Sequence, residues 1–81
     1  MINIPMKLNL QSTSESIEGH LPLRGGSLKF ADKLDNIIKV YRTQNDILRI
    51  ATMPYMVIEV PLTEDQLNNG FETTLIFDNN V

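Results

Sequence analysis

Few side chains of this sequence are suited to catalysis, and their spacing matches no known catalytic arrangement. His20 is the only histidine, and its chain neighbours Gly19 and Leu21 offer no group that would orient or activate it. The serines at positions 12, 14, 16 and 27 lie outside any G-x-S-x-G turn, so a Ser–His–Asp triad is not indicated. We therefore expect no catalytic residues and no enzymatic activity.

The acidic residues do not suggest a metal or acid–base site. Glu64 and Asp65 are adjacent carboxylates, but with Thr63 and Gln66 they form a capping box, which is typical of the first turn of a helix. The chain has no cysteine and a single histidine, which leaves no common set of zinc ligands. We expect no metal site, no cofactor and no small-molecule substrate.

Arg24-Gly25-Gly26, followed by Ser27, is the one segment that resembles an anion-binding loop. Backbone N–H groups of such a segment can bind an anion at the start of a helix. The segment lacks both the G-x-x-x-x-G-K-[ST] and the G-x-G-x-x-G spacings of nucleotide sites. We interpret it as a turn, because two glycines permit a sharp reversal of the chain.

Composition and charge exclude several classes of protein. The net charge is −3 and the basic residues are spread along the chain among acidic ones, which argues against a nucleic-acid-binding face. No apolar run approaches the ~20 residues needed to span a bilayer. The first residues lack the basic start and apolar stretch of a signal peptide. We expect one small domain, residues 1–81, in the cytoplasm or in a virion assembled there.

The N-terminal third of the sequence shows the period of β-strands. Apolar and polar residues alternate from Ile2 to Leu10, which predicts a strand with one face on a core. Residues 12–16 are polar and predict a loop. A weaker alternation over Ile17 to Leu23 includes Pro22, which predicts a short or edge strand.

The next segment shows a helical period. Its apolar residues fall on one stripe at about 100° per residue; they are Phe30, Ala31, Leu34, Ile37, Ile38 and Tyr41. Charged and amide residues occupy the other side; they are Lys29, Asp32, Asp35, Asn36, Lys39 and Arg42. We predict an amphipathic helix over Phe30 to Tyr41, with Ser27 as N-cap and Asn45 as its stop. The competing interpretation is a strand over Ile37 to Arg42, because isoleucine, valine and tyrosine favour strands.

The rest of the chain returns to strands. We predict them at Ile47 to Met53, Tyr55 to Leu62 and Phe71 to Phe77, with a short helix from Thr63 to Gly70 before the last. Tyr55 to Leu62 has apolar residues on both faces, which predicts an interior strand or one covered by a partner.

These elements predict an α+β domain, in which one amphipathic helix covers a mostly antiparallel sheet of four or five strands. The order is β-β-α-β-β-β, and an all-β fold is the alternative. The uncovered sheet face would be apolar, and apolar patches usually mark interfaces. We predict that Met53, Tyr55, Val57 and Ile47 contribute to this interaction surface.

The segment Ile4-Pro5-Met6-Lys7-Leu8-Asn9-Leu10-Gln11-Ser12-Thr13-Ser14 resembles the start of short uncharacterised proteins from head and tail gene modules of phages and prophages of Gram-positive bacteria. The resemblance implies a small virion or assembly protein and no catalytic residues.

Two hypotheses of function follow. The first is a non-enzymatic structural or interaction module that self-associates, or docks on a larger assembly, through its sheet. The second is a small acidic regulator or inhibitor that binds a single protein partner through its acidic groups. Salt would abolish binding in the second case more readily than in the first.

Overall fold

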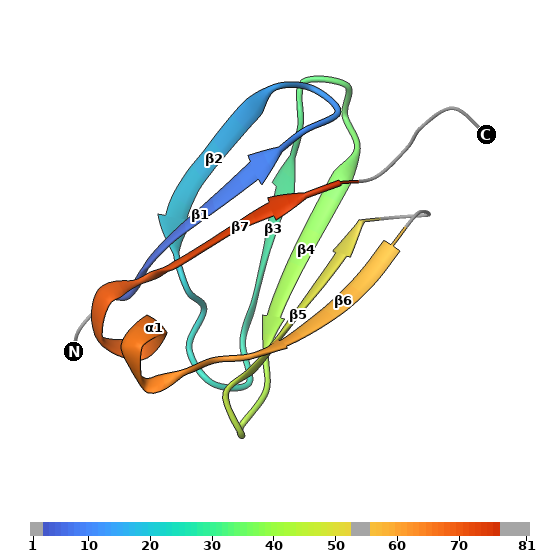
Figure 1. Ribbon diagram of the computed structural model, residues 1–81. Helices are drawn as coiled ribbons and strands as arrows, with labels where there is room; N and C mark the ends of the chain where they lie inside the picture. The colour runs from blue at the N-terminus through green and yellow to red at the C-terminus, as the bar shows by residue number, and fades with distance from the viewer. Residues whose placement is uncertain (1–2, 53–55, 77–81) are drawn as a thin grey trace.

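The chain folds as two β-sheets packed face to face, with one short helix at an edge (Figure 1). The computed structural model describes residues 3–52 and 56–76. Its elements, in chain order, are β1 (Pro5–Leu10), β2 (Glu15–His20), β3 (Ser27–Ala31), β4 (Ile37–Arg42), β5 (Ile47–Thr52), β6 (Met56–Pro61), α1 (Glu64–Asn69) and β7 (Phe71–Leu75).

The smaller sheet brings together strands from both parts of the chain. Its order is β2-β1-β7, with β1 antiparallel to β2 and parallel to β7. The short helix α1 makes this parallel pairing possible, because it carries the chain from the end of β6 back to the start of β7. Gly70 ends α1 at a φ of 117°, and a Cβ there would lie 3.1 Å from the carbonyl oxygen of Pro5. Glycine is therefore required where β7 first meets β1.

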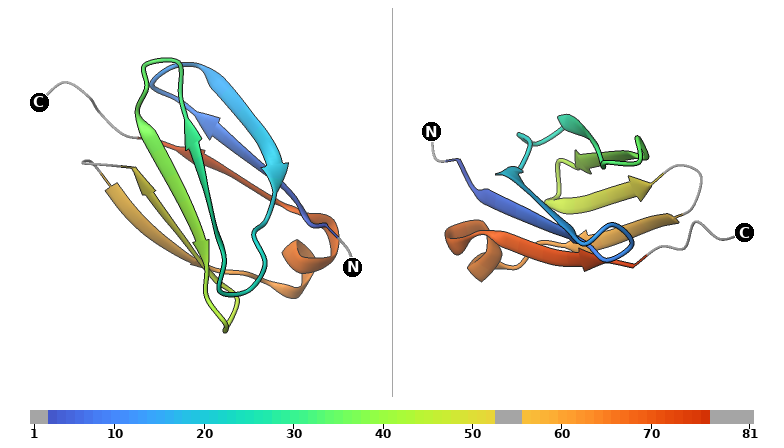
Figure 2. Two further views of the ribbon diagram at one scale, coloured as in Figure 1. Left: turned by 180° about the vertical axis from the view of Figure 1, so that it is seen from behind. Right: turned by 90° about the horizontal axis from the view of Figure 1, so that it is seen from above.

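The larger sheet is an antiparallel meander in the order β3-β4-β5-β6. Short turns join β3 to β4 and β4 to β5, and the edges of the sheet are β3 and β6. Seen from behind, these four strands form the near layer, and β2, β1 and β7 lie beyond them (Figure 2, left).

The core is the single layer of side chains between the two sheets. Met6, Leu8 and Leu10 of β1 are buried, which confirms the predicted alternation over the described part of that strand. They pack against the inward side chains of the larger sheet and of β7; these are chiefly Ile38, Val40, Leu48, Ile50, Phe71 and Leu75. In each strand the alternate residues therefore face outward.

The amphipathic helix predicted over Phe30 to Tyr41, with its N-cap at Ser27 and its stop at Asn45, is wrong. These residues form β3, a turn and β4, so the competing strand interpretation of Ile37 to Arg42 is the correct one. The Asp32 carboxylate accepts hydrogen bonds from the N–H groups of Leu34 and Asn36 at 2.9 and 2.8 Å, which stabilises a turn. Asp35 has a φ of 63°, which no helix accommodates.

The predicted α+β fold class is confirmed only in part. The protein is largely β and mostly antiparallel, with one short helix, and the capping box at Thr63 and Gln66 is present as predicted. The strands form two sheets instead of one, and no large helix covers either sheet within residues 3–52 and 56–76. The predicted edge position of the second strand is confirmed by β2. The interior position expected for Tyr55 to Leu62 is wrong, because β6 is an edge strand.

Adjacent isoleucines in β4 provide a direct test of this arrangement. Ile38 is fully buried, whereas its neighbour Ile37 is 38% exposed on the outer face. Replacement of either by threonine keeps the β-branched shape. We expect Ile38→Thr to lower the free energy of unfolding by about 2–3 kcal/mol, because it buries a hydroxyl group and removes apolar contact. Ile37→Thr should cost less than about 1 kcal/mol.

Urea denaturation of the two variants measures this difference. Similar losses in both would contradict the strand, because a helical stripe would place both isoleucines against the core.

Candidate interaction surface

The outward side chains of the larger sheet form a surface that we call the β3–β6 face. Its residues are those that alternate with the buried positions of each strand; they are Ser27, Lys29, Ala31, Ile37, Lys39, Tyr41, Ile47, Arg49, Ala51, Val57, Glu59 and Pro61. None of these side chains is covered by another element in the described part of the chain, and the left view of Figure 2 looks onto this face.

Apolar groups are exposed over part of this face. Val57 is 64% exposed and lies directly opposite Ala51 on the neighbouring strand. Together with Lys39, Tyr41 and Arg49, these two residues line an open hollow of about 440 Å³. An open hollow lined by both apolar and charged side chains is suited to receive side chains of another protein.

The charges of the β3–β6 face are mostly positive. Lys29 and Lys39 are exposed and stand directly opposite each other on β3 and β4. Like charges in this position destabilise a sheet. The Arg49 guanidinium is 2.8 Å from the Glu59 carboxylate, but both side chains are about half exposed, so this ion pair adds little stability. The lysine pair has no such partner among the described residues.

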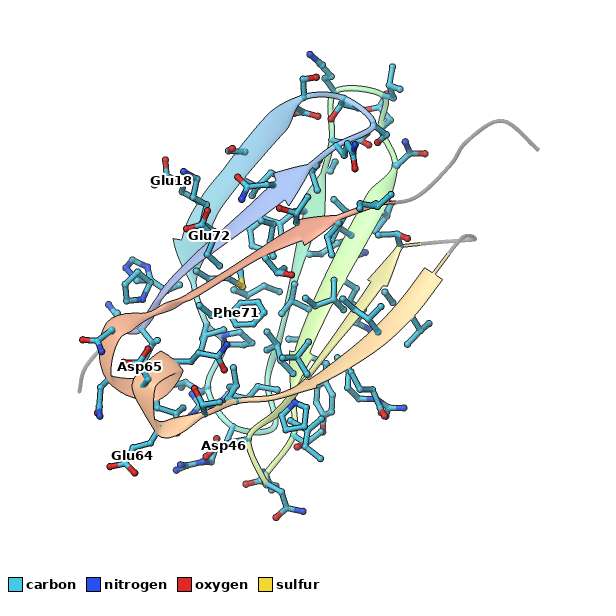
Figure 3. All side chains as sticks on the ribbon, in the orientation of Figure 1. Glu18, Asp46, Glu64, Asp65, Phe71 and Glu72 are labelled. Carbon is cyan, nitrogen blue, oxygen red and sulfur yellow. The ribbon has the colours of Figure 1, made fainter. Side chains whose placement is uncertain are left out.

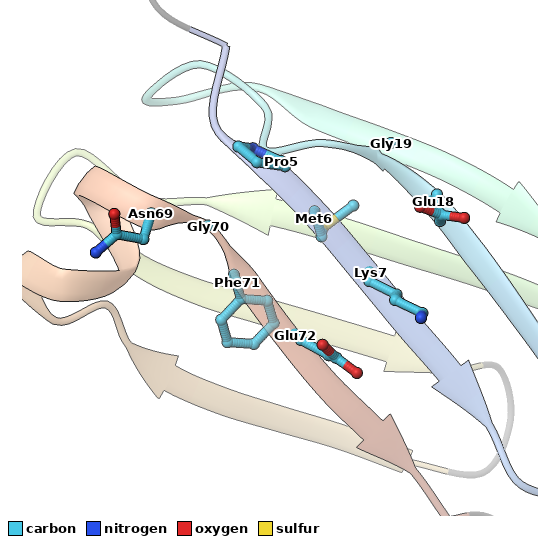
Figure 4. Close-up of a pocket in the computed structure, with 9 residues that line it drawn as sticks. All are labelled: Pro5, Met6, Lys7, Glu18, Gly19, Asn69, Gly70, Phe71 and Glu72. Atoms are coloured by element: carbon cyan, nitrogen blue, oxygen red, sulfur yellow. The ribbon is translucent and has the colours of Figure 1, made fainter.

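The outer face of the smaller sheet has the opposite character. Lys7 of β1 lies between Glu18 of β2 and Glu72 of β7 in the strand register, beside a hollow of about 240 Å³ (Figure 4). Next to this row, the Asn9 amide donates a hydrogen bond to Glu72 at 3.0 Å and accepts one from Ser16 at 2.8 Å. The charged side chains of this surface are more acidic than basic, with Glu18 and Glu72 against Lys7.

One carboxylate fixes the loops at the end of the sandwich where β4 meets β5. Asp46, which is labelled in Figure 3, accepts two hydrogen bonds from Arg24 at 2.8 Å each and one from Arg42 at 2.9 Å. Arg42 is itself buried and also donates to the carbonyl oxygen of Pro22 at 3.3 Å. The backbone carbonyl of Asp46 accepts the N–H of Leu62 at 2.9 Å. Three separate segments are thus joined beside the β3–β6 face.

These contacts determine the charge state of the carboxylate. The hydrogen bond from Arg24 lowers the pKa of Asp46 to about 2, with further help from Arg42 and against the opposing effect of burial. The site is therefore an ion-pair cluster that holds the fold together, and Arg42 is not the exposed helix residue that its spacing suggested.

At the other end of the sandwich, two more acidic residues accept hydrogen bonds that stabilise the turns. Glu15 accepts hydrogen bonds from the Thr13 hydroxyl at 2.6 Å and from the Lys33 N–H at 2.9 Å, which joins the turn after β1 to the turn after β3. Burial raises the pKa of Asp32, but the hydrogen bonds from Asn36 and Leu34 outweigh it and leave the pKa below its ordinary value.

The low pKa of Asp46 makes stability depend on pH. An unfolded aspartate has a pKa of about 3.9, so the unfolded state takes up this proton first as the pH falls. The stabilisation is complete above about pH 5 and is lost toward pH 2. We expect Asp46→Asn to lower the free energy of unfolding at pH 7 by about 1–3 kcal/mol and to flatten its decline between pH 5 and pH 2.

Asp35→Asn is the matched control, because Asp35 has a similar positive φ of 63° against 60° and makes no ion pair within the described residues. Thermal denaturation at several pH values measures both. A decline as steep in Asp46→Asn as in the unaltered protein would contradict this account.

The structure separates the residues predicted to form an interaction surface. Val57 is exposed on β6, and Ile47 is half-buried at the start of β5, opposite Pro61. The two share the β3–β6 face but lie toward opposite ends of it. Met53 and Tyr55 lie outside the described residues.

The positive side of this face does not follow from the helical period. That period puts Lys29 and Lys39 on the side opposite Tyr41, whereas the strands put all three on the face that carries Val57. The signal that would have found them is the alternation Ile38, Val40, Arg42 against Lys39 and Tyr41, which has the period of a strand.

Comparisons of the chain with protein-family models, with curated proteins and with solved structures found no match. Within residues 3–52 and 56–76, no group of acidic or histidine side chains is arranged to hold a metal ion, and no helix is long and apolar enough to cross a membrane.

Proposed function

We propose that this protein is a non-enzymatic structural module that self-associates through the β3–β6 face. The observation that carries the proposal is the exposure of Val57 beside Ala51 and Tyr41 on a sheet face that no other described element covers. An exposed apolar group on an uncovered sheet face gains free energy by burial against another protein.

The size of the face indicates how strong such a contact would be. Four strands about 4.8 Å apart, each about six residues long at about 3.3 Å per residue, present a surface on the order of 400 Å². A stable interface usually takes about 800 Å² from each partner. A single contact through this face should therefore be weak and dependent on concentration, as is typical of modules that act in repeated arrays.

A role in a virion is compatible with this proposal. The resemblance of residues 4–14 to proteins of phage head and tail modules implies an assembly protein, and contacts that are weak one by one become strong when several are made together. The proposed place in the cell is accordingly the cytoplasm or a virion assembled there.

The second candidate is a small acidic regulator that binds one protein partner. The observation that favours it is the row of Glu18 and Glu72 on the smaller sheet, together with the exposed Glu64 and Asp65 at the start of α1 (Figure 3). A basic surface on a partner would complement these charges. In that case the protein alone would stay monomeric.

Replacement of Val57 tests the self-association. We expect the unaltered protein to exceed its monomer mass of 9.2 kDa at concentrations of about 100 µM, and Val57→Glu to remain a monomer there, because the variant puts a charge into the proposed contact. Light scattering after size-exclusion chromatography measures the mass.

Leu34→Glu is the matched control, since Leu34 is an equally exposed apolar residue (62%) in the turn after β3 and lies off the β3–β6 face. Circular dichroism establishes that each variant is folded. A monomeric unaltered protein, or an equal effect of both variants, would contradict the proposal.

A further inference from the structure

We infer that the partner of the β3–β6 face is the opposite face of a second copy, so that copies associate head to tail. This inference rests on the proposed self-association and specifies which surfaces meet. The reason is the separation of charge between the two outer faces of the sandwich.

The β3–β6 face is the positive side of the molecule. It carries Lys29, Lys39 and Arg49 against the single acid Glu59, which already pairs with Arg49 at 2.8 Å. The excess positive charge is therefore concentrated at the two opposed lysines, next to Ala51 and the exposed Val57.

The outer face of the smaller sheet, which we call the acidic face, is the negative side. Glu18 and Glu72 are exposed on its two edge strands, and Lys7 between them offsets one of the two charges. The helix that leads into β7 adds the exposed Glu64 and Asp65, and its last turn has no basic residue. Figure 4 shows Glu18 and Glu72 on either side of Lys7.

Charge decides between the two possible geometries. In a symmetric dimer the β3–β6 faces of two copies would meet, so both contributing surfaces would carry an excess of positive charge. Repulsion between like charges disfavours this geometry. In a head-to-tail contact the lysines of one copy approach Glu18 and Glu72 of the next, and the hollow beside Val57 receives side chains from the acidic face.

A head-to-tail contact has a structural consequence. Each copy keeps one free face of each kind, so addition continues until a ring closes or a filament forms. Association should weaken with salt, because exposed charges supply much of its energy.

Charge reversal on one face at a time tests the inference. The first variant is Lys29→Glu/Lys39→Glu, which reverses the β3–β6 face, and the second is Glu18→Lys/Glu72→Lys, which reverses the acidic face. Each should associate with itself at least about tenfold more weakly than the unaltered protein. An equal mixture should regain association, because the intact acidic face of the first variant complements the intact β3–β6 face of the second, and the two reversed faces complement each other.

A third variant combines all four substitutions and keeps the net charge of −3. Its two faces are complementary again with their charges exchanged, so we expect it to regain association that either pair of substitutions abolishes. Sedimentation velocity at low and high salt measures all of these masses, and Lys33→Glu, in the turn after β3, controls for a charge change away from both faces.

The outcomes separate the two proposals. If Glu18→Lys/Glu72→Lys associates as strongly as the unaltered protein, the contact is not head to tail, although self-association stands. If the mixture does not associate, or the fourfold variant stays monomeric, the head-to-tail contact is likewise overturned. If the unaltered protein is a monomer at every concentration and salt level, both proposals fail.

Discussion

Each sheet of this protein can bury its apolar side only against the other sheet. A chain of 81 residues without cysteine has neither a large core nor a disulfide to compensate for a poor fit. The inward residues of β1, such as Leu8, pack against those of β4 and β5, such as Val40 and Ile50. Together they form a single layer of fully buried side chains. Each strand therefore directs one set of alternate side chains inward. The other set faces outward and is available for contact with other molecules.

The polar groups at the ends of the sandwich keep the two sheets in register with each other. Asp46 joins Arg24 and Arg42 at one end, and Glu15 joins two turns at the other. Removal of a single partner would leave a buried charge or a polar group without its hydrogen bond. The contribution of each group to stability therefore depends on the presence of the others. They also join the loops that border the β3–β6 face, at the turns between β4 and β5 and between β3 and β4.

The same alternation that builds the core produces two outer faces of different charge. The four-stranded sheet presents the opposed pair Lys29 and Lys39 beside an exposed valine, and the three-stranded sheet presents Glu18 and Glu72. The two outer faces therefore carry net charges of opposite sign, and complementary faces favour ordered stacking over random contact. The proposed function thus depends on the tertiary arrangement of ordinary surface residues and not on any reactive group.

The sequence by itself determined the elements whose signals are local. The alternation of β1, the turn at Gly25 and the capping box at Thr63 depend on neighbouring residues, and the structure contains all three. It did not determine Ile37 to Arg42, because their apolar residues fit a helical stripe while their residue types favour a strand, and only the pairing with β3 and β5 on both sides decides between them. The tertiary structure also decided that β7 pairs with β1 and that Lys39 shares a face with Val57, since both depend on contacts between residues far apart in the chain.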